Sequence, residues 1–496
     1  MNTVVKTQYG EVHGSVADGV HTFKGIPYAA PPFGANRLRP PQPVAPWSGV
    51  RDALSYGPKA PQPPYPPGME LFLPPELTSP GEDCLTLNIW SPDLGSAGLP
   101  VMVWIAGGLF EYHGTGASPW YDGSRFARDG IVCVTINYRV GAEGFLSLGE
   151  GNANRGLLDQ IAALEWVQEN IAAFGGDPGN VTIFGESAGG MSVGTLLSMP
   201  RTQGLFRRAI AQSGSAHHVT SAATAQRISQ YLAEKLGVAA TREAIAAVPL
   251  DRLLAVQEEL KFDIDAHPDP ERWGEVAANL LPFEPVIDGE ILPARPIDGI
   301  VAGARAGVDV MVGTNTDEWR LMLVPGGVIE QVTNEALVAV VEAYGLPVEA
   351  ALATYRTAHP DAHAGDLLAA IQGDWYWRIP TIRVAEAHAK NSSATYMYEF
   401  AWCSPQFNGL LGACHSLEIA FVFDTLGNGT EPLLGTDPPQ QLADTMHAAW
   451  VAFASRGDAG WPKYDLKRRA TMRFDTISEV VDDPRSAERA LWEGLR

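Results

Sequence analysis

The chain has 496 residues, of which 46% are hydrophobic and 19% charged, and this composition excludes intrinsic disorder. Acidic residues outnumber basic ones by 57 to 35, and the net charge of −22 argues against nucleic acid or an anionic membrane as a partner. The longest apolar stretch, residues 99–110, is much shorter than the roughly 20 residues of a membrane-spanning helix. We therefore expect a soluble globular protein.

Cysteine usage and the first residues bear on the cellular compartment. Four cysteines are too few for a disulfide framework in a chain of this length, and no Cys-x-x-Cys or Cys/His cluster predicts a zinc site. Residues 1–7 lack the basic region and apolar run of an export signal. These features predict a cytoplasmic protein.

Short β-branched and apolar runs bounded by turn residues predict six strands, at residues 86–90, 101–105, 131–137, 181–184, 308–312 and 395–400. Several are apolar almost throughout, as in strands that helices cover on both faces. Residues 157–173 repeat apolar side chains at helical spacing. Strand, helix and strand thus alternate through the first half of the chain, which indicates an α/β fold with parallel pairing.

Longer helical stretches, at residues 223–260 and 334–372, interrupt this alternation and are interpreted as insertions that cover one end of the sheet. The proline-rich segment 61–80 predicts a surface loop. Internal repeats and flexible linkers are not evident. We therefore expect a single domain over residues 1–496, with helical excursions at about 220–300 and 330–375.

The strand at residues 181–184 leads into a Gly-x-Ser-x-Gly pattern at residues 185–189. In a nucleophile elbow the strand-to-helix turn is so tight that the neighbours of the serine must be small, and the turn exposes the serine hydroxyl above the sheet. Ser187 is therefore a candidate nucleophile, and the N–H of Ala188 is a candidate donor to a developing oxyanion. Because glycine and serine are common, an ordinary turn is the alternative for this motif alone.

A second oxyanion donor is expected from an earlier glycine-rich loop that follows a strand. Residues 104–110 fit that position and contain Gly107 and Gly108. The backbone N–H groups of Gly108 and Leu109 are the candidates, to act together with Ala188. Taken alone, this pair of glycines is better explained as a plain turn.

In this type of fold the serine is followed by an acid and then by a histidine. Most histidines after Ser187 lie in helical patterns or in a polar loop, whereas His415 follows the strand 395–400 and a glycine-containing loop, which makes it the candidate base. The strand 308–312 ends just before Asp317 and Glu318. Position alone does not choose between these two carboxylates.

Several stretches resemble the type-B carboxylesterase family, in its bacterial para-nitrobenzyl esterase branch, which is related to the cholinesterases. The resemblance covers nearly the full length and rests on residues 23–29, 82–90, 137–139, 174–178 and 185–189 and on the segments around residues 317–318 and 414–415. It implies an α/β-hydrolase fold with a large, mostly parallel central sheet flanked by helices. Helical insertions are then expected over the active-site end.

The resemblance also implies roles for individual residues. Ser187 is the nucleophile, Glu318 rather than Asp317 is the acid, and His415 is the base. Ser213 resembles the serine that supports the acid in this family.

Two ion pairs of the family are also expected by resemblance, Arg37 with Glu82 and Arg139 with Asp159. Cys84 is similar to a disulfide cysteine of the family, but its expected partner region, residues 59–62, has no cysteine. That bridge is therefore not expected, in line with a cytoplasmic location.

The sequence departs from the family pattern at the oxyanion loop, where a His-Gly-Gly-Gly or His-Gly-Gly-Ala motif is replaced by residues 106–109, Ala-Gly-Gly-Leu. Backbone donors survive such a change, but the Leu109 side chain is expected to crowd the site or to alter the loop path. Trp319 replaces a customary glycine, and Glu143 replaces an aromatic residue. Simple packing variation and an altered substrate pocket both remain open for these two positions.

The resemblance and the candidate residues together predict a serine carboxylesterase that forms an acyl-enzyme on Ser187 and needs no metal or organic cofactor. An amidase or carbamate hydrolase with the same three residues, and a non-catalytic binding homologue, are the alternatives. Activity is expected to fall on the acid side as His415 becomes protonated. The expected partner is a small-molecule ester, with the protein a monomer or a weak homo-oligomer.

The substrate pocket is expected to be mostly apolar and to favour uncharged aryl and short-chain alkyl esters. Its candidate lining residues lie next to the catalytic stretches, and core packing is the alternative for each: Leu109, Phe110, Phe283, Trp319, Leu321 and Met322.

Overall fold

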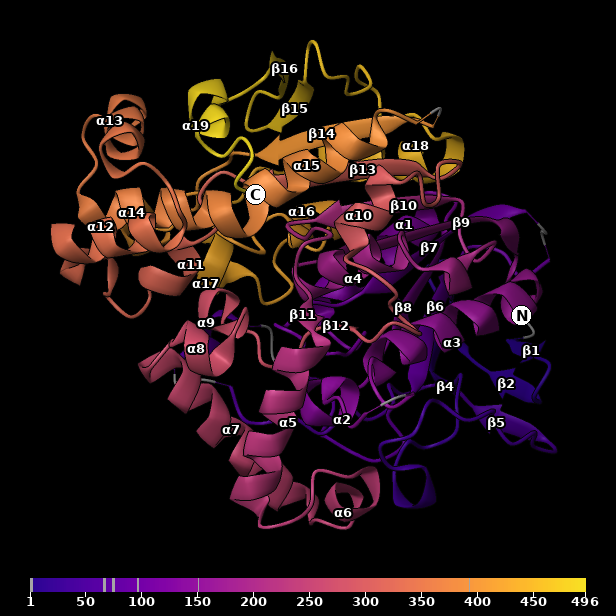
Figure 1. Cartoon of the computed structure of the whole chain (residues 1–496). Helices are drawn as coiled ribbons and strands as arrows, with labels where there is room; N and C mark the ends of the chain where they lie inside the picture. The colour runs from indigo at the N-terminus through magenta and orange to yellow at the C-terminus, as the bar shows by residue number, and fades with distance from the viewer. Residues whose placement is uncertain (1–2, 66–67, 74–75, 96–97, 150, 392) are drawn as a thin grey trace.

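A mixed sheet of 11 strands runs through the computed structural model, which describes residues 3–65, 68–73, 76–95, 98–149, 151–391 and 393–496 (Figure 1). In order across the sheet, its strands are β16 (Glu479–Asp482), β15 (Ala470–Phe474), β14 (Thr395–Phe400), β13 (Asp309–Asn315), β10 (Arg208–Gln212), β9 (Gly176–Glu186), β7 (Leu99–Ile105), β8 (Val132–Ile136), β6 (Thr86–Ser91), β4 (Val20–Pro27) and β3 (Ser15–Ala17).

The strands pair in parallel from β15 to β8, and antiparallel pairs lie at both edges of the sheet. Every residue of β6, β8 and β14 is buried, as expected for strands that helices cover on both faces, and so is every residue of β10, which was not predicted. The predicted fold class, a mostly parallel sheet flanked by helices, is confirmed, and all six predicted strands belong to this sheet.

Helices cover both faces of the sheet (Figure 1). One layer contains α3 (Arg155–Asn170), α4 (Ala188–Leu196), α10 (Pro296–Val301) and α15 (Ile379–His388). The other contains α1 (Ser124–Arg128), α16 (Ile419–Phe423) and α18 (Gln440–Arg456). The apolar positions repeated along residues 157–173 lie in α3, where Leu164 and Val167 are fully buried.

Two helical lobes lie at the carboxyl end of the parallel strands, toward which the arrow of β14 points in Figure 1. One lobe contains α5 (Ala222–Leu236), α6 (Arg242–Ala246), α7 (Leu250–Ala266), α8 (Pro270–Trp273) and α9 (Val276–Asn279). The other contains α11 (Arg320–Leu323), α12 (Asn334–Ala343), α13 (Val348–Ala358), α14 (Ala364–Gly373) and the π-helical turn η7 (Asp374–Arg378). Each stretch predicted as helical is broken into shorter helices, for example at Gly237, which ends α5 with a φ of 71°.

The remaining elements surround this framework. Two small sheets are formed by β1 (Val4–Lys6), β2 (Glu11–His13) and β5 (Val50–Asp52), and by β11 (Thr220–Ser221) and β12 (Val286–Ile287). The short helices are α2 (Gly141–Phe145), α17 (Glu431–Leu434) and α19 (Ser486–Leu491). Residues 66–67 and 74–75 of the proline-rich segment, and residues 1–2 of the segment tested for an export signal, lie outside the described residues.

Among the helices described, none is by itself long and apolar enough to span a bilayer; α12 and α13 meet that test of length and composition only as a pair, bent by 117°.

The strand order places a topological switch point between β7 and β9. The chain passes from β7 to β8 on one side, and β9 pairs with β7 on the other. In open α/β sheets, ligands bind outside the carboxyl ends of the strands at such a point, because the loops diverge there. Ile105 at the end of β7 is paired with Gly185, so the loop after β7 lies beside the turn after β9.

The expected pair of Arg37 with Glu82 is wrong. Arg37 is buried and contacts Glu143, with Arg37 Nε 2.7 Å from Glu143 Oε1, while Glu82 is exposed. Glu143 lies on α2 directly after β8, and in this buried position it supplies the carboxylate that Arg37 requires. The departure at Glu143 is therefore explained by an ion pair in the core.

Arg139 and Asp159 form the second expected pair, and neither side chain is exposed to solvent. The guanidinium holds the carboxylate with two bonds, Nε to Oδ2 at 2.8 Å and Nη2 to Oδ1 at 2.7 Å. The Arg139 backbone N–H also donates to Asp159, at 3.1 Å. The pair thereby fixes the turn after β8 to α3.

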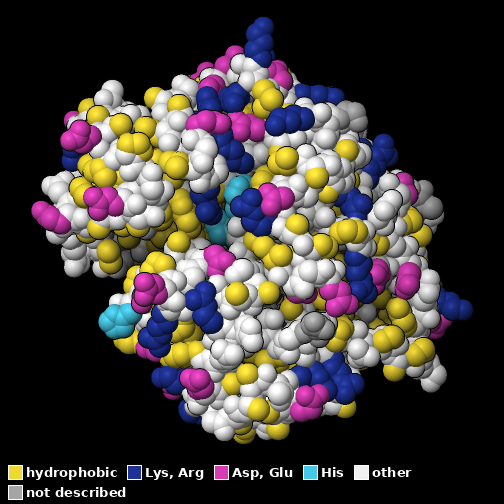
Figure 2. Space-filling model, in the orientation of Figure 1, with side chains coloured by type: hydrophobic (Ala, Val, Ile, Leu, Met, Phe, Trp, Pro, Cys, Tyr) yellow, Lys and Arg dark blue, Asp and Glu magenta, His cyan; other side chains and the backbone are white. Residues whose placement is uncertain are grey.

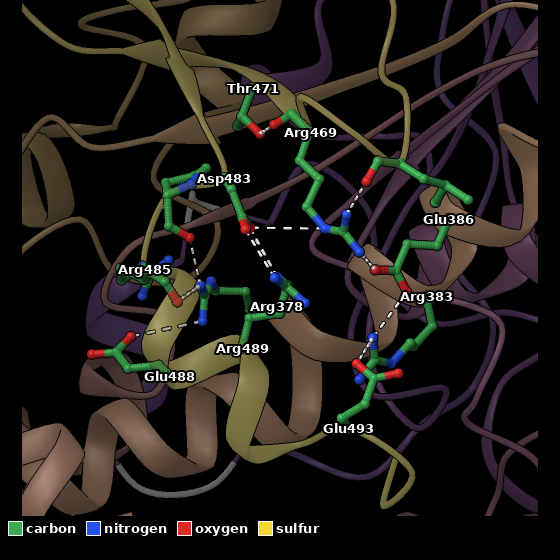
Figure 3. Close-up of polar contacts among 12 residues, drawn as sticks. Arg378, Arg383, Glu386, Arg469, Thr471, Asp483, Arg485, Glu488, Arg489 and Glu493 are labelled. Atoms are coloured by element: carbon green, nitrogen blue, oxygen red, sulfur yellow. Dashed lines mark hydrogen bonds and ion pairs between the residues drawn. The ribbon is translucent and has the colours of Figure 1, made fainter.

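A group of ion pairs joins α15, η7, β15 and α19 at the other edge of the sheet (Figure 3). Asp483 accepts from Arg489 at 2.8 Å, and Arg378 contacts Asp374 at 3.0 Å. Arg383 contacts Glu386 at 2.9 Å. Each of these arginines has a carboxylate partner within hydrogen-bonding distance.

We predict that Asp159→Asn lowers the free energy of unfolding by about 3–5 kcal/mol, because the fully buried Arg139 guanidinium then lacks a counter-charge. Urea unfolding followed by tryptophan fluorescence measures the change. Asp52→Asn is the control, because the Asp52 side chain is 77% exposed and pairs only with His13, so its change is expected to stay within about 0.5 kcal/mol. Equal effects of the two substitutions contradict the prediction.

Candidate active site

Ser187 lies in the turn between β9 and α4 with a φ of 58° and a ψ of −125°. A non-glycine residue rarely adopts a positive φ, and such strain persists only where the surrounding structure enforces it. Backbone bonds hold the turn on both sides: the Ser187 N–H donates to Gln212 at 3.0 Å, and the Met191 N–H donates to Ser187 at 2.8 Å. This is the geometry of a nucleophile elbow.

The glycines of the motif are required by close backbone approach. A Cβ at Gly189 would lie 1.9 Å from the Ile105 carbonyl oxygen at the end of β7. A Cβ at Gly185 would lie 2.6 Å from the same oxygen. These contacts are far shorter than any side chain tolerates, so both positions depend on glycine for the turn to pack against β7.

The loop after β7 runs directly beside the elbow. A Cβ at Gly107 would lie 2.9 Å from the Ser187 Cβ. Gly108 has a φ of 111°, a conformation that glycine adopts readily. In the described part of the chain, the N–H groups of Gly108, Leu109 and Ala188 donate to no protein acceptor. The structure therefore brings these three expected donors to the elbow with their N–H groups unpaired.

Leu109 and Phe110 both have a φ of 59°, so the loop follows a left-handed path at two successive non-glycine residues. The path is held by bonds to its carbonyls, with the Tyr112 N–H donating to Gly108 at 2.8 Å and the Gly141 N–H donating to Phe110 at 2.6 Å. The Tyr138 hydroxyl donates to the Ala106 carbonyl at 2.7 Å. The unusual Ala-Gly-Gly-Leu sequence is thus accommodated by a rigid loop.

Glu318 and His415 lie in contact at the carboxyl ends of β13 and β14, with Glu318 Oε2 2.6 Å from His415 Nδ1. The other carboxylate oxygen accepts from the Ser213 hydroxyl at 2.6 Å and from the Asn315 N–H at 2.8 Å. Asp317 does not reach the imidazole and instead accepts from the Ala413 N–H at 3.0 Å. Glu318 therefore orients the ring, and Asp317 holds the loop that carries it.

The far nitrogen of His415 faces Glu186, the variable residue of the elbow motif. Nε2 lies 3.2 Å from Glu186 Oε1. No hydrogen bond joins His415 to the Ser187 hydroxyl, although both residues belong to the described part of the chain and both are buried. Of the two contacts that a Ser-His-Glu arrangement needs, the structure forms the one between acid and histidine.

Four further residues complete the surroundings of the imidazole and were not predicted. Asn315 donates to the Cys414 carbonyl at 2.7 Å and to Glu418 Oε2 at 2.8 Å, and Gln212 donates to Glu418 Oε1 at 3.2 Å. The fourth is Glu186. Its position next to Ser187 in the Gly-x-Ser-x-Gly motif could have indicated that it lies near the imidazole. Glu418 follows His415 by three residues, and the pattern of charges alone does not distinguish it from a surface glutamate.

Buried carboxylates control the charge state of this site. Burial raises the pKa of Glu186 to about 8, although nearby His415 opposes this rise. Burial by itself lowers the pKa of His415, but Glu186 and Glu318 outweigh burial and raise it to about 9. Burial, followed by the charge of Glu318, also raises the pKa of Glu418. The imidazole is therefore a stronger base than a solvated histidine.

An aromatic wall packs against the imidazole. The ring centre of Trp377, on the π-helical turn η7, lies 4.6 Å from that of His415, and Trp319 lies 5.1 Å from Trp377. Tyr376 lies 4.5 Å from Trp377. Trp319, an expected pocket residue, thus reaches the site through Trp377, which the sequence analysis missed.

The other expected lining residues are distributed differently. Phe110 is fully buried against Phe145 at 5.0 Å, and Phe283 is also fully buried. Leu321 and Met322 are half-buried on α11. Full burial of Phe110 and Phe283 fits the packing alternative, and their place in a substrate pocket stays a prediction.

In the described ranges, no three His, Cys, Asp or Glu side chains are grouped so as to hold a metal ion.

Comparison with known proteins agrees with this geometry. The model of the carboxylesterase family matches residues 1–492. The chain belongs to the carboxylesterase family. It is a carboxylic-ester hydrolase of this family, and the predicted resemblance to para-nitrobenzyl esterases is confirmed. The matched region contains Ser187, Glu318 and His415.

Two curated relatives and one solved structure illustrate the similarity. The para-nitrobenzyl esterase of Bacillus subtilis (strain 168) is 39% identical over 98% of this chain and 97% of its own. The phenmedipham hydrolase of Pseudarthrobacter oxydans is 35% identical over 98% of this chain and 96% of its own. The structure of the Geobacillus stearothermophilus carboxylesterase EST55 covers 99% of this chain and 100% of its own, with 39% identity and a TM-score of 0.86.

We predict that Glu186→Gln moves the acid limb of the kcat/KM profile to lower pH by about one unit. The reason is that the neutral imidazole is the active base, and a nearby carboxylate stabilises its protonated form, which raises the pKa of His415. Hydrolysis of an uncharged ester between about pH 5 and pH 9 measures the limb. Glu349→Gln on the exposed side of α13 is the matched control. An unmoved limb, or one moved to higher pH, contradicts the prediction.

We also predict that Ser213→Ala lowers kcat/KM by about 10- to 100-fold, because a hydrogen bond to a charged, buried Glu318 is lost. Ser215→Ala is a close control, since the Ser215 hydroxyl is buried but bonds to no partner in the described chain. Steady-state kinetics with circular dichroism as a check of folding compare the two. If Ser215→Ala lowers activity as much, the Ser213 bond has no special role.

Proposed function

We propose that this hydrolase cleaves uncharged aryl and short-chain alkyl esters through an acyl-enzyme on Ser187, with His415 as base and Glu318 as acid. The observation that carries the proposal is the 2.6 Å contact between Glu318 and His415 beside the Ser187 elbow. The N–H groups of Gly108, Leu109 and Ala188 support it, because they have no acceptor in the described chain and belong to the elbow and to the loop that packs beside it.

In the first step the Ser187 hydroxyl attacks the ester carbonyl while His415 Nε2 takes the proton. Nε2 faces Glu186 in the free protein, so the imidazole turns from this carboxylate toward Ser187 when substrate binds. The carbonyl oxygen becomes an oxyanion that accepts from the three backbone donors. His415 then passes the proton to the departing alcohol.

In the second step His415 removes a proton from water, which attacks the acyl group and releases the acid from Ser187. Glu318 keeps the Nδ1 proton in place and stabilises the imidazolium. All of these steps use the chain's own groups. Serine, histidine and backbone amides suffice for acyl transfer.

The substrate class follows from the walls of the site. Trp319 and Trp377 present aromatic surface next to His415, which favours aryl and alkyl groups over polar ones. A monomeric or weakly oligomeric state and a cytoplasmic location stay predictions.

The test is hydrolysis of a p-nitrophenyl ester series from acetate to octanoate by the wild type and by Ser187→Ala. We expect the substitution to lower kcat/KM by about four to six orders of magnitude, because the nucleophile is removed. The preferred chain length measures the depth of the acyl pocket.

Ser198→Ala is the matched control, since its hydroxyl donates only to the Thr195 carbonyl at 2.8 Å. Ser187→Ala with wild-type activity rejects the acyl-enzyme. A folded wild type that is inactive on all esters, or that prefers the corresponding anilides, rejects the substrate class.

A further inference from the structure

Arg496 has a buried guanidinium without a counter-ion. Its Cζ lies 3.8 Å from the centre of the Trp375 ring, and its Nε is buried without a hydrogen-bond partner. Among the described residues, no carboxylate forms an ion pair with it. A buried charge is normally paired, because removal from water is costly.

The neighbouring arginines differ from Arg496, because each of them has a carboxylate partner. Arg378, Arg383 and Arg489 each contact a carboxylate at 2.8 to 3.0 Å, and Figure 3 shows these contacts for Arg383 and Arg489. The carboxyl group whose charge acts on Arg496 is that of Glu284, which accepts instead from Thr220 at 2.6 Å. Burial raises the pKa of Glu284 to about 8, so in neutral solution this group is mainly protonated and leaves Arg496 uncompensated.

Two histidines beside Arg496 also lack partners. His218 is 2% exposed, and neither of its ring nitrogens forms a hydrogen bond in the described chain. His217 Nδ1 is likewise buried and unpaired. Burial, followed by the charge of Arg496, lowers the pKa of both rings, that of His217 to about 3. Each is thus a neutral imidazole with one N–H to donate.

A chain of aromatic contacts connects His218 to His415. The His218 ring centre is 4.4 Å from that of Tyr376, Tyr376 is 4.5 Å from Trp377, and Trp377 is 4.6 Å from His415. The His218 ring is therefore no more than three ring-to-ring steps from the catalytic imidazole. Figure 2 shows histidine next to Lys or Arg atoms in a hollow between the two helical lobes.

We propose that Arg496, His217 and His218 bind a carboxylate carried by the substrate, so that half-esters of dicarboxylic acids are a preferred substrate class. The proposal rests on the esterase function proposed above. A guanidinium is suited to this ligand, because its planar N–H groups match the two oxygens of a carboxylate. In a chain with a net charge of −22, a local cationic site is needed to retain an anionic ester.

The test compares p-nitrophenyl octanoate with the mono-p-nitrophenyl ester of suberic acid, whose acyl chains have the same number of carbons. We expect Arg496→Gln to lower kcat/KM for the half-ester about tenfold or more through KM, and to leave octanoate within about twofold. The kcat/KM of Arg496→Lys for the half-ester is expected to lie between those of the wild type and Arg496→Gln, because lysine keeps the charge and loses the two parallel N–H donors of the guanidinium. Arg252→Gln, on an exposed arginine of α7, is expected to change neither substrate.

Equal losses on both substrates, or a wild type that cleaves octanoate and not the half-ester, overturn the anionic site while the esterase function stands. If the half-ester and every p-nitrophenyl ester from acetate to octanoate are left uncleaved, the function proposed above fails, and a binding measurement decides the carboxylate site by itself. Calorimetry measures the binding of monomethyl suberate to Ser187→Ala and to the double variant that also has Arg496→Gln. Binding to the first and none to the second supports the site. Unchanged binding overturns it.

Discussion

Direct backbone contact between the end of β7 and the first turn of α4 is the constraint on which the rest of the site depends. Gly189 lies against the Ile105 carbonyl with no room for a Cβ, and a Cβ at Gly107 would likewise be too close to Ser187. Because both contacts form at the switch point of the sheet, the strained serine and the unpaired N–H groups occupy one place. The sheet thereby positions the serine and three unpaired backbone N–H groups through main-chain packing.

The histidine is held by a different principle, in which buried carboxyl groups surround one imidazole. Glu318 and Glu186 face its two nitrogens, and Asn315 ties the acid loop to the histidine loop through the Cys414 carbonyl. Burial makes every one of these groups costly unless it is paired or protonated. The arrangement favours an imidazole with a raised pKa. The free-energy cost of burying these groups falls at the residues proposed for proton transfer.

Sequence patterns were sufficient to predict an element of the fold where one physical signal, such as apolar burial or close packing, dominated. The apolar runs predicted six buried strands correctly, and the small residues around Ser187 indicated the turn, because both reflect local packing. The strand β10 escaped prediction, since its short Arg-Ala-Ile-Ala-Gln sequence is only weakly apolar. The long helical stretches were predicted without their breaks, which depend on single residues such as Gly237.

Pairings between distant residues were harder to predict. Arg37 was assigned to Glu82 by resemblance, yet a carboxylate newly placed at Glu143 has replaced that partner. Nothing in the chain near Arg496 indicates that Trp375 covers its guanidinium, because the contact joins residues that are 121 positions apart and forms only when the segment after α19 packs against η7. Position in the sequence did not choose between Asp317 and Glu318; the family resemblance chose Glu318, and the structure places this residue against His415.

The two sides of the site also differ in how freely they can evolve. The oxyanion side consists of main chain packed on main chain, so substitutions at Gly107 or Gly189 disturb the architecture before they alter selectivity. The opposite side consists of the aromatic side chains of Trp319, just before α11, and of Tyr376 and Trp377 on the π-helical turn, with Trp319 only half-buried. We therefore expect substitutions that change the substrate range, in nature or in a laboratory library, to fall on this aromatic side.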